Sequence, residues 1–276
     1  MFLEIFSLLC AVALSVTGSL TFWPVGGHWY NFYIPIVLFI AGYLASIPLL
    51  FVIEGFAGLF VKQKKQYTKV SKWARFWLMQ GTRYVADHAY ILTKKTGLNK
   101  VPQKEKFLLV CNHRSKFDNF VITNVLGKLD IAFVTKQSNY KIPFARRFLP
   151  GLCYIPVDRD DKLQSLEAFK RATSLIETGA TSIGVFPEGT RRQDGILGDF
   201  HEGVFNIAIH SKAPIVVMTL DRTEKIHKRW PFRPTVVKFD VLATIRSEEY
   251  EGMTAKAVSD MVHQLMDEHL KRLQGQ

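Results

Sequence analysis

The sequence predicts an α/β fold, a mixed sheet flanked by helices, preceded by an N-terminal two-helix membrane hairpin. Two observations support this prediction. The first 61 residues contain none of the 36 lysine and arginine residues. Beyond Pro102, short apolar runs alternate with stretches of helical periodicity, which is the pattern of packed sheet and helix layers. With 276 residues and 48% apolar composition, the chain is long enough for one sizeable domain and an additional segment.

The N-terminal region, in which Glu4 and Glu54 are the charged side chains, contains two apolar stretches, Phe2 to Trp23 and Tyr33 to Ile53. Each reaches the roughly twenty residues that cross a bilayer core. Aromatic residues bracket the loop between the stretches, as at a membrane surface: Trp23, Trp29, Tyr30 and Tyr33. A secretory signal peptide is the alternative, but the first stretch lacks a basic start and a clear small-residue cleavage site. We therefore expect a hairpin over residues 1–61 that spans the bilayer or dips into one leaflet.

Basic residues follow the second apolar stretch closely: Lys62, Lys64, Lys65, Lys69 and Lys72. By the positive-inside tendency, the rest of the chain lies on the cytoplasmic face of an integral membrane protein. The net charge of +12 suits anionic lipid and phosphorylated substrates. The sequence has no recognition-helix or stacking-sheet signature, so no nucleic acid partner is predicted.

A basic and aromatic helical region is expected over residues 62–100. Within it, tryptophan and phenylalanine residues alternate with basic ones between Tyr67 and Leu98. Such a helix suits a membrane interface, with its aromatic side toward the lipid. An ordinary amphipathic helix packed on the domain gives the same pattern, and the two interpretations stay open.

An αβ domain is expected over residues 101–276. The predicted strands are short apolar runs: Phe107–Cys111, Ile131–Thr135, Ser182–Phe186, Ile215–Leu220 and Val236–Leu242. The clearest helix covers Asp161–Thr178, with its inward face at Leu163, Leu166, Phe169, Thr173 and Ile176. A last helix covers Thr254–Leu273, with Ala257, Met261, Leu265 and Leu273 inward. Cys10, Cys111 and Cys153 have no metal-type spacing, so we expect buried thiols in a reducing compartment and no metal site.

His113 and Asp118 follow the first of these strands and are candidates for a base and its orienting carboxylate. Five residues on a regular helix turn through about 500°, so two helical side chains at this spacing would not meet. His113 should therefore lie in the turn before a helix, with Ser115 as the N-cap and Asp118 at the third helical position of a capping box. Capping alone is the alternative role for Asp118. Ser115 is not in a Gly-x-Ser-x-Gly elbow, which favours direct attack by a substrate alcohol over a protein nucleophile.

A second charged turn follows the strand that ends at Phe186: Pro187, Glu188, Gly189, Thr190, Arg191 and Arg192. Its arginines offer paired donors suited to phosphate, and the backbone at the glycine can approach an anion closely. A solvated charged turn is the alternative. Arg146, Arg147 and Arg159 lie in another loop between the two motifs and are further candidate phosphate ligands.

Four ordered blocks between Val101 and Leu220 resemble the glycerolipid acyltransferases, in particular the 1-acylglycerol-3-phosphate (lysophosphatidic acid) acyltransferases. The blocks are Asn112-His113-x4-Asp118, Lys136 through Ile142-Pro143 to Ile155-x-Val157-Asp158-Arg159, Phe186-Pro187-Glu188-Gly189-Thr190-Arg191, and Ala213-Pro214-Ile215-Val216. The resemblance implies that His113 is the general base and Asp118 its partner. It also implies that Arg159, Glu188, Gly189, Thr190 and Arg191 contribute to binding the acceptor, in an αβ domain held at the membrane by N-terminal helices.

The chain departs from the family pattern at several positions. Arg146 and Cys153 stand where the second block usually has glycine, and Val217 stands where the fourth commonly has a second proline. After the third block, Phe200-His201-Glu202-Gly203 replaces the usual Phe-Lys-x-Gly. These blocks help to shape the acceptor pocket, so the departures leave the acceptor open.

The resemblance predicts a 1-acylglycerol-3-phosphate O-acyltransferase of phospholipid biosynthesis. It would transfer a fatty acyl group from an acyl thioester, acyl-CoA or acyl carrier protein, to the 2-hydroxyl of lysophosphatidic acid. No metal or redox cofactor is expected, and the expected partners are the bilayer, a lysophospholipid and the acyl donor. The alternatives are glycerol 3-phosphate or another lysophospholipid as acceptor, a non-catalytic protein that binds anionic lipid, and a membrane-bound hydrolase.

Overall fold

The computed structural model describes residues 2–22, 33–63, 65–142, 145–158 and 161–275. Within them, seven strands form one sheet in the order β1-β7-β6-β2-β5-β3-β4. Their bounds are β1 Ile91–Thr96, β2 Leu108–Cys111, β3 Ile131–Lys136, β4 Ile155–Val157, β5 Ser182–Val185, β6 Ile215–Asp221 and β7 Thr235–Ile245. The strands from β6 to β4 are parallel, whereas β7 runs antiparallel to β6 and parallel to β1. The predicted mixed sheet is confirmed.

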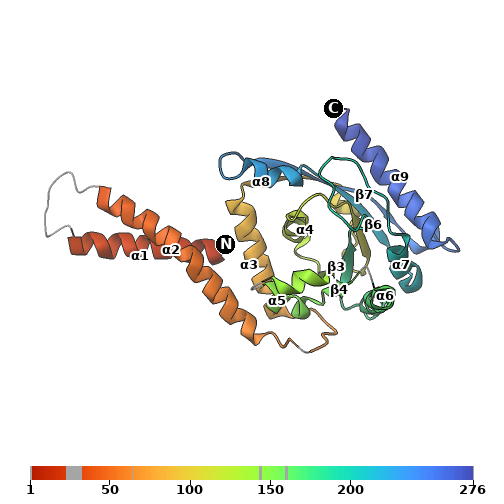
Figure 1. The fold of residues 1–276 in the computed structure, drawn as a ribbon, viewed down its shortest axis with the longest axis horizontal. Helices are drawn as coiled ribbons and strands as arrows, with labels where there is room; N and C mark the ends of the chain where they lie inside the picture. Colours follow the sequence, from red (N-terminus) through yellow and green to blue (C-terminus); the bar gives the residue numbers. More distant parts are fainter. Residues whose placement is uncertain (1, 23–32, 64, 143–144, 159–160, 276) are drawn as a thin grey trace.

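Helices lie on both sides of this sheet (Figure 1). Helices α3, α4 and α5 lie on the side of the N-terminal hairpin, and α6, α7 and α9 lie on the other side. The helix bounds are α1 Phe2–Phe22, α2 Tyr33–Ala57, α3 Lys72–His88, α4 Asp118–Leu126, α5 Ala145–Phe148, α6 Lys162–Glu177, α7 Asn206–Ser211, α8 Ile226–Arg229 and α9 Ala255–Gln274.

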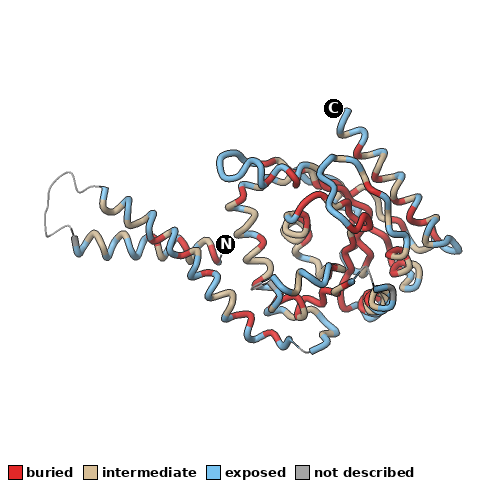
Figure 2. Tube along the Cα trace, in the orientation of Figure 1, coloured by how far each residue is buried: buried red, intermediate tan, exposed pale blue. Residues whose placement is uncertain are grey.

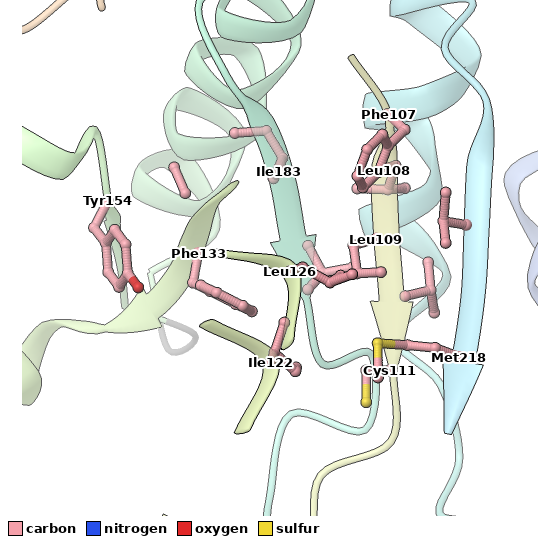
Figure 3. Packing of buried hydrophobic residues seen from close by; sticks show 14 of the residues in the cluster. Phe107, Leu108, Leu109, Cys111, Ile122, Leu126, Phe133, Tyr154, Ile183 and Met218 are labelled. Carbon is pink, nitrogen blue, oxygen red and sulfur yellow. The ribbon is translucent and has the colours of Figure 1, made fainter. Parts of the chain in front are cut away.

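The central strands form the core between the two helical layers. Every residue of β2 and of β5 is buried, because strands covered on both faces have no solvent-facing side. Figure 3 shows Leu109 of β2 and Ile183 of β5 in the same buried cluster as Ile122 and Leu126 of α4. Burial of such apolar side chains is the main stabilising contribution to the domain.

Helices α1 and α2 form an antiparallel pair that projects away from the sheet (Figure 1). Both are long and apolar enough to cross a membrane, by length and composition. Most of their surface is exposed (Figure 2), including Leu9, Leu20 and Val52, each more than 60% exposed. An apolar pair that is uncovered by protein is a candidate membrane hairpin. The tryptophan and tyrosine residues predicted to bracket its loop, Trp23, Trp29 and Tyr30, lie outside the described residues.

Helix α3 packs on α4 and also contacts α1. Ala74 and Trp77 are buried in these contacts, whereas Trp73 and Phe76 are more than 40% exposed. The helix therefore has a face on the domain and an exposed aromatic face beside the hairpin. Residues 91–96, within the region predicted to be helical, form the edge strand β1.

Two predicted helix faces were partly wrong. In α6, Leu163 and Leu166 are exposed. Ile176 is buried as predicted, but the other buried residues are Ala168, Ala172 and Leu175. The small alanines let the helix lie close to β4 and β5. In α9 the buried face is rotated by one residue, to Val258, Val262, Met266 and Leu270. Strand β4 was also missed, since it has three residues and a proline that only an edge strand accepts.

Candidate active site

The two charged segments singled out in the sequence follow neighbouring strands. Val110 of β2 pairs with Val185 of β5, and Cys111 of β2 pairs with Met218 of β6. His113 follows the end of β2 and Glu188 follows the end of β5. The carboxyl ends of parallel strands meet at one edge of the sheet, and ligands commonly bind there in open α/β sheets.

His113 and Asp118 are in direct contact. His113 Nδ1 lies 2.7 Å from Asp118 Oδ2, with the carboxylate fully buried on the first turn of α4. The same oxygen accepts the backbone N–H groups of Arg114 at 2.7 Å and Ser115 at 2.9 Å. The other oxygen, Oδ1, accepts the Thr223 hydroxyl at 2.6 Å. A carboxylate oxygen only accepts, so His113 Nδ1 is the donor in this hydrogen bond.

The predicted capping box forms only in part. The helix begins at Asp118, with Phe117 as the N-cap and no side-chain cap, so Asp118 is not at the third helical position. Ser115 Oγ accepts the Phe117 N–H at 2.9 Å, and the Asp118 carboxylate reaches back to the Ser115 N–H. His113 lies in the turn before the helix, as helix geometry predicted.

The His113 ring is fixed on a second side by Phe186. Their ring centroids are 4.2 Å apart and the rings are nearly parallel, at 21°. Phe186 in turn stacks on Phe133 of β3, at 5.8 Å. The His113 side chain is 15% exposed, and within the described part of the chain Nε2 has no hydrogen-bond partner. An oriented imidazole with one free nitrogen can act as a base toward a small group at this edge.

Glu188 links the two segments. Its Oε1 accepts the His113 backbone N–H at 2.7 Å, and its Oε2 accepts the Gly198 N–H at 2.9 Å. A second link between the segments is the Arg192 N–H, which donates to the His113 carbonyl at 2.9 Å. Burial raises the pKa of Glu188, against the opposing effect of these hydrogen bonds. With both oxygens bound to backbone, Glu188 is arranged to position His113.

Gly189 of this turn is buried, and the residues after it face outward. Gly189 has a φ of +70°, and its N–H donates to the Phe186 carbonyl. Thr190 and Arg191 are exposed, and Arg191 has no ion pair or hydrogen bond within the described residues. Arg192, by contrast, pairs with Asp194 at 3.0 Å. Arg191 is therefore available to an anion, whereas Arg192 is already paired.

Arg159 lies outside the described residues, so its position relative to this turn stays a prediction. Arg146 and Arg147 are on α5, in a separate recess. Within the described residues, no group of three or more histidine, cysteine, aspartate or glutamate side chains could hold a metal ion.

Sequence reasoning assigned no role to three residues that support the site. Asn112 is buried and forms two hydrogen bonds with the Leu220 backbone of β6, at 2.8 and 2.9 Å. Arg114 is buried and pairs with Asp221 at 3.1 Å. Thr223, just beyond β6, holds Asp118. These contacts join positions more than 100 residues apart, so no local spacing could have indicated them.

Comparison with known proteins identifies the family. Residues 93–221 match the Acyltransferase family model. The chloroplastic 1-acyl-sn-glycerol-3-phosphate acyltransferase BAT2 of Brassica napus is 30% identical over 190 residues, which cover 68% of this chain and 52% of that protein. The chain carries a glycerolipid acyltransferase domain.

Other relatives agree with this assignment of the acyltransferase domain. The chloroplastic 1-acyl-sn-glycerol-3-phosphate acyltransferase LPAT1 of Arabidopsis thaliana is 34% identical over 131 residues, covering 47% of this chain and 36% of that protein. The chain thus spans about half the length of these relatives, or less. The crystal structure of the 1-acyl-sn-glycerophosphate (LPA) acyltransferase PlsC of Thermotoga maritima has a TM-score of 0.64 at 20% identity, covering 82% of this chain and 88% of that one. The two chains share a fold.

Proposed function

We propose that the chain transfers a fatty acyl group from an acyl thioester, acyl-CoA or acyl carrier protein, to the 2-hydroxyl of lysophosphatidic acid. The observation that best supports this proposal is the His113 ring. Its Nδ1 is hydrogen-bonded to Asp118, and its Nε2 has no hydrogen-bond partner among the described residues. The names of the relatives from Brassica napus and Arabidopsis thaliana support lysophosphatidic acid as acceptor.

In this mechanism His113 Nε2 accepts the proton of the acceptor hydroxyl as its oxygen attacks the thioester carbonyl carbon. The imidazolium that forms is stabilised by the buried Asp118 carboxylate. The tetrahedral intermediate then collapses, the carbon–sulfur bond breaks, and the thiolate takes the proton from His113. The products are phosphatidic acid and a free thiol, and no protein nucleophile or redox step is needed.

The acceptor phosphate would bind at the turn after β5. Arg191 is exposed and unpaired in the described structure, and a guanidinium binds phosphate through paired hydrogen bonds. Gly189 and Thr190 bring backbone close to the same surface, and Arg159 is a further proposed ligand. Glu188 contributes by holding the His113 backbone.

The hairpin would attach the domain to the bilayer. Two apolar helices over residues 1–61 would enter the lipid, the region 62–100 would lie at the interface, and residues 101–276 would carry the chemistry. The lysines that follow the second helix favour a cytoplasmic location for the domain.

An acceptor panel tests this function. The full chain, purified in neutral detergent, is supplied with labelled acyl donor and with lysophosphatidic acid, glycerol 3-phosphate, other lysophospholipids or water. We expect phosphatidic acid as the main product. Preferred acylation of another acceptor would show that lysophosphatidic acid is not the substrate. Release of free fatty acid alone would indicate a hydrolase. Binding of anionic lipid without any product would indicate a non-catalytic protein. Running each acceptor with acyl-CoA and with acyl carrier protein identifies the donor.

A further inference from the structure

A recess of about 290 Å³ lies where the chain leaves the hairpin and meets α5. Among the described residues, Gln63, Tyr140, Arg146 and Arg147 line it. The Gln63 amide donates to the carbonyl oxygens of Val61 and Arg147, both at 2.9 Å. One wall therefore belongs to the segment after the hairpin and the other to the αβ domain, and the Gln63 side chain joins them.

Arg147 packs directly against the end of the hairpin. A Cβ atom at Gly58, in the short 3₁₀ helix η3 (Gly58–Phe60), would come within 2.9 Å of the Arg147 Cβ and Cδ atoms. Only glycine at this position leaves room for the stem of the arginine. The aliphatic part of Arg147 is thus packed at the base of the hairpin.

The surroundings of the recess are strongly basic. The sequence has no aspartate or glutamate from residue 55 to 86 or from 131 to 157, and these two segments together carry eleven lysine and arginine residues. Neither Arg146 nor Arg147 has an ion-pair partner within the described part of the chain. Adjacent guanidinium groups without a carboxylate favour a bound anion.

Tyr140 adds a neutral polar wall. Its hydroxyl donates to the Tyr154 carbonyl at 2.8 Å. Burial raises the pKa of Tyr140 to about 12, so the phenol stays uncharged at neutral pH and does not repel an anion.

Exposed aromatic residues lie near this recess, at the end of the hairpin that joins the domain. Phe56 and Phe60 are 63% and 64% exposed, and their ring centroids are 5.5 Å apart. Trp73 of α3 lies 5.9 Å from Phe60, and its Nε1 donates to the Ala57 carbonyl at 2.9 Å. Such rings are typical of the level of the lipid headgroups. Gly58 of η3, which packs on Arg147, lies between Phe56 and Phe60 in the same segment.

We propose that the recess binds the phosphate of an anionic phospholipid of the bilayer, as a site separate from the acceptor site. The proposal rests on the membrane attachment described under the proposed function. Arg146 and Arg147 would hold the phosphate, and the lipid chains would pass beside Phe56 and Phe60. Because the two walls come from the hairpin segment and from the domain, a bound lipid would stabilise the junction between them.

Thermal unfolding of the full chain in neutral detergent tests the site. The melting temperature is measured by tryptophan fluorescence during titration with dioctanoyl phosphatidylglycerol, dioctanoyl phosphatidylcholine or inorganic phosphate. The variant is R146Q with R147Q. The matched control is K94Q with K95Q, which removes two adjacent exposed charges from β1, at the opposite edge of the sheet from β4.

We expect phosphatidylglycerol to raise the melting temperature of the wild type and of the lysine control, and the arginine variant to bind it about tenfold more weakly or worse. Phosphatidylcholine should have no such effect. Equal binding of phosphatidylglycerol by the wild type, the arginine variant and the lysine control would overturn the proposal. The lipid would then bind without Arg146 and Arg147. Equal stabilisation by inorganic phosphate would overturn it too, since the site would then take free anions and not lipid.

A second measurement separates this site from the acceptor site. Acyl transfer to lysophosphatidic acid is assayed in phosphatidylcholine vesicles, where we expect the arginine variant to keep the wild-type KM for the acceptor. A tenfold rise in that KM would contradict a separate site. If the wild type transfers no acyl group while the lipid titration behaves as expected, the proposed function fails and the lipid site stands.

Discussion

The Thr223 hydroxyl donates a 2.6 Å hydrogen bond to Asp118 Oδ1, and both side chains are fully buried. His113 Nδ1 and two backbone N–H groups all use the other oxygen, Oδ2. Within the described residues, Thr223 is therefore the one donor to Oδ1. Because Thr223 follows β6 and His113 follows β2, the hydrogen bond connects two neighbouring strand ends through the carboxylate.

We predict that Thr223→Val lowers both stability and turnover. Valine keeps the shape of threonine but leaves Asp118 Oδ1 buried without a donor, which costs about 1–3 kcal/mol. A carboxylate that can shift holds His113 less firmly, so kcat should fall roughly tenfold. Thermal unfolding and steady-state kinetics measure the two effects.

Thr219 provides a matched control on β6, the strand that Thr223 follows. It is 1% exposed, and its Oγ1 has no hydrogen-bond partner in the described structure. Thr219→Val should therefore leave stability unchanged or raise it, because no hydrogen bond is lost. Equal loss in the two variants would mean that the Thr223 hydroxyl has no special role.

Glu188→Gln should destabilise the protein and lower kcat. A glutamine has one acceptor oxygen, so its NH₂ group would meet either the His113 or the Gly198 N–H, at a cost of about 1–3 kcal/mol. The pKa of Glu188 is raised in the fold, so the folded state binds its proton more tightly than the unfolded state does. Its contribution to stability is full at low pH and declines as the pH rises through the raised pKa.

Denaturant titration from acid to neutral pH gives the free energy of unfolding of the wild type and of Glu188→Gln. It tests the direction of this pH dependence. The advantage of the wild type should shrink as the pH rises from acid to neutral. An advantage that grows with pH would show that the carboxylate is favoured by its backbone hydrogen bonds more than it is disfavoured by burial.

Arg191→Ala should weaken acceptor binding. We expect the KM for the acceptor to rise about tenfold with kcat little changed, because a contact to the phosphate is made equally in the ground state and in the transition state. Arg192→Ala is the matched control, since the neighbouring guanidinium is taken by Asp194. A similar rise in both variants would point to overall charge and not to a phosphate ligand.

Cys111 should resist alkylation in the native protein. Its thiol is fully buried, and burial followed by the nearby Asp118 charge raises its pKa well above the ordinary value. Iodoacetamide reacts with the thiolate, so labelling of Cys111 should stay slow between about pH 7 and 9 and become fast in denaturant. Peptide mass spectrometry measures it, and a native rate that climbs with pH over this range would disagree with the buried site.

The sequence predicted the parts of the site that depend on local geometry. His113 and Asp118 are five residues apart, and helix geometry alone required the histidine to precede the helix. The central strands were also predicted, because their apolar runs are buried on both faces. The α/β layers were predicted from the alternation of strand and helix patterns, and the two N-terminal helices from the length of their apolar stretches.

The contacts that complete the site depend on topology. Thr223 reaches Asp118, and Asn112 reaches Leu220, across more than 100 residues. Only the neighbouring positions of β2 and β6 bring these residues together, and no pattern in the sequence encodes that order. The inward face of α6 was partly wrong for a related reason, since Ala168 and Ala172 are buried while Leu163 and Leu166 are exposed. The catalytic and substrate-binding roles stay predictions.

Acyl transfer by His113→Ala tests the central claim most directly. The control is His210→Ala, which removes an exposed imidazole from α7. With lysophosphatidic acid and acyl-CoA or acyl carrier protein, His113→Ala should lose roughly 10²–10⁴-fold or more of the wild-type kcat. Its melting temperature and its membrane fraction should stay near those of the wild type, and His210→Ala should remain active. Near-normal turnover by a folded His113→Ala protein would contradict the assignment of His113 as the base.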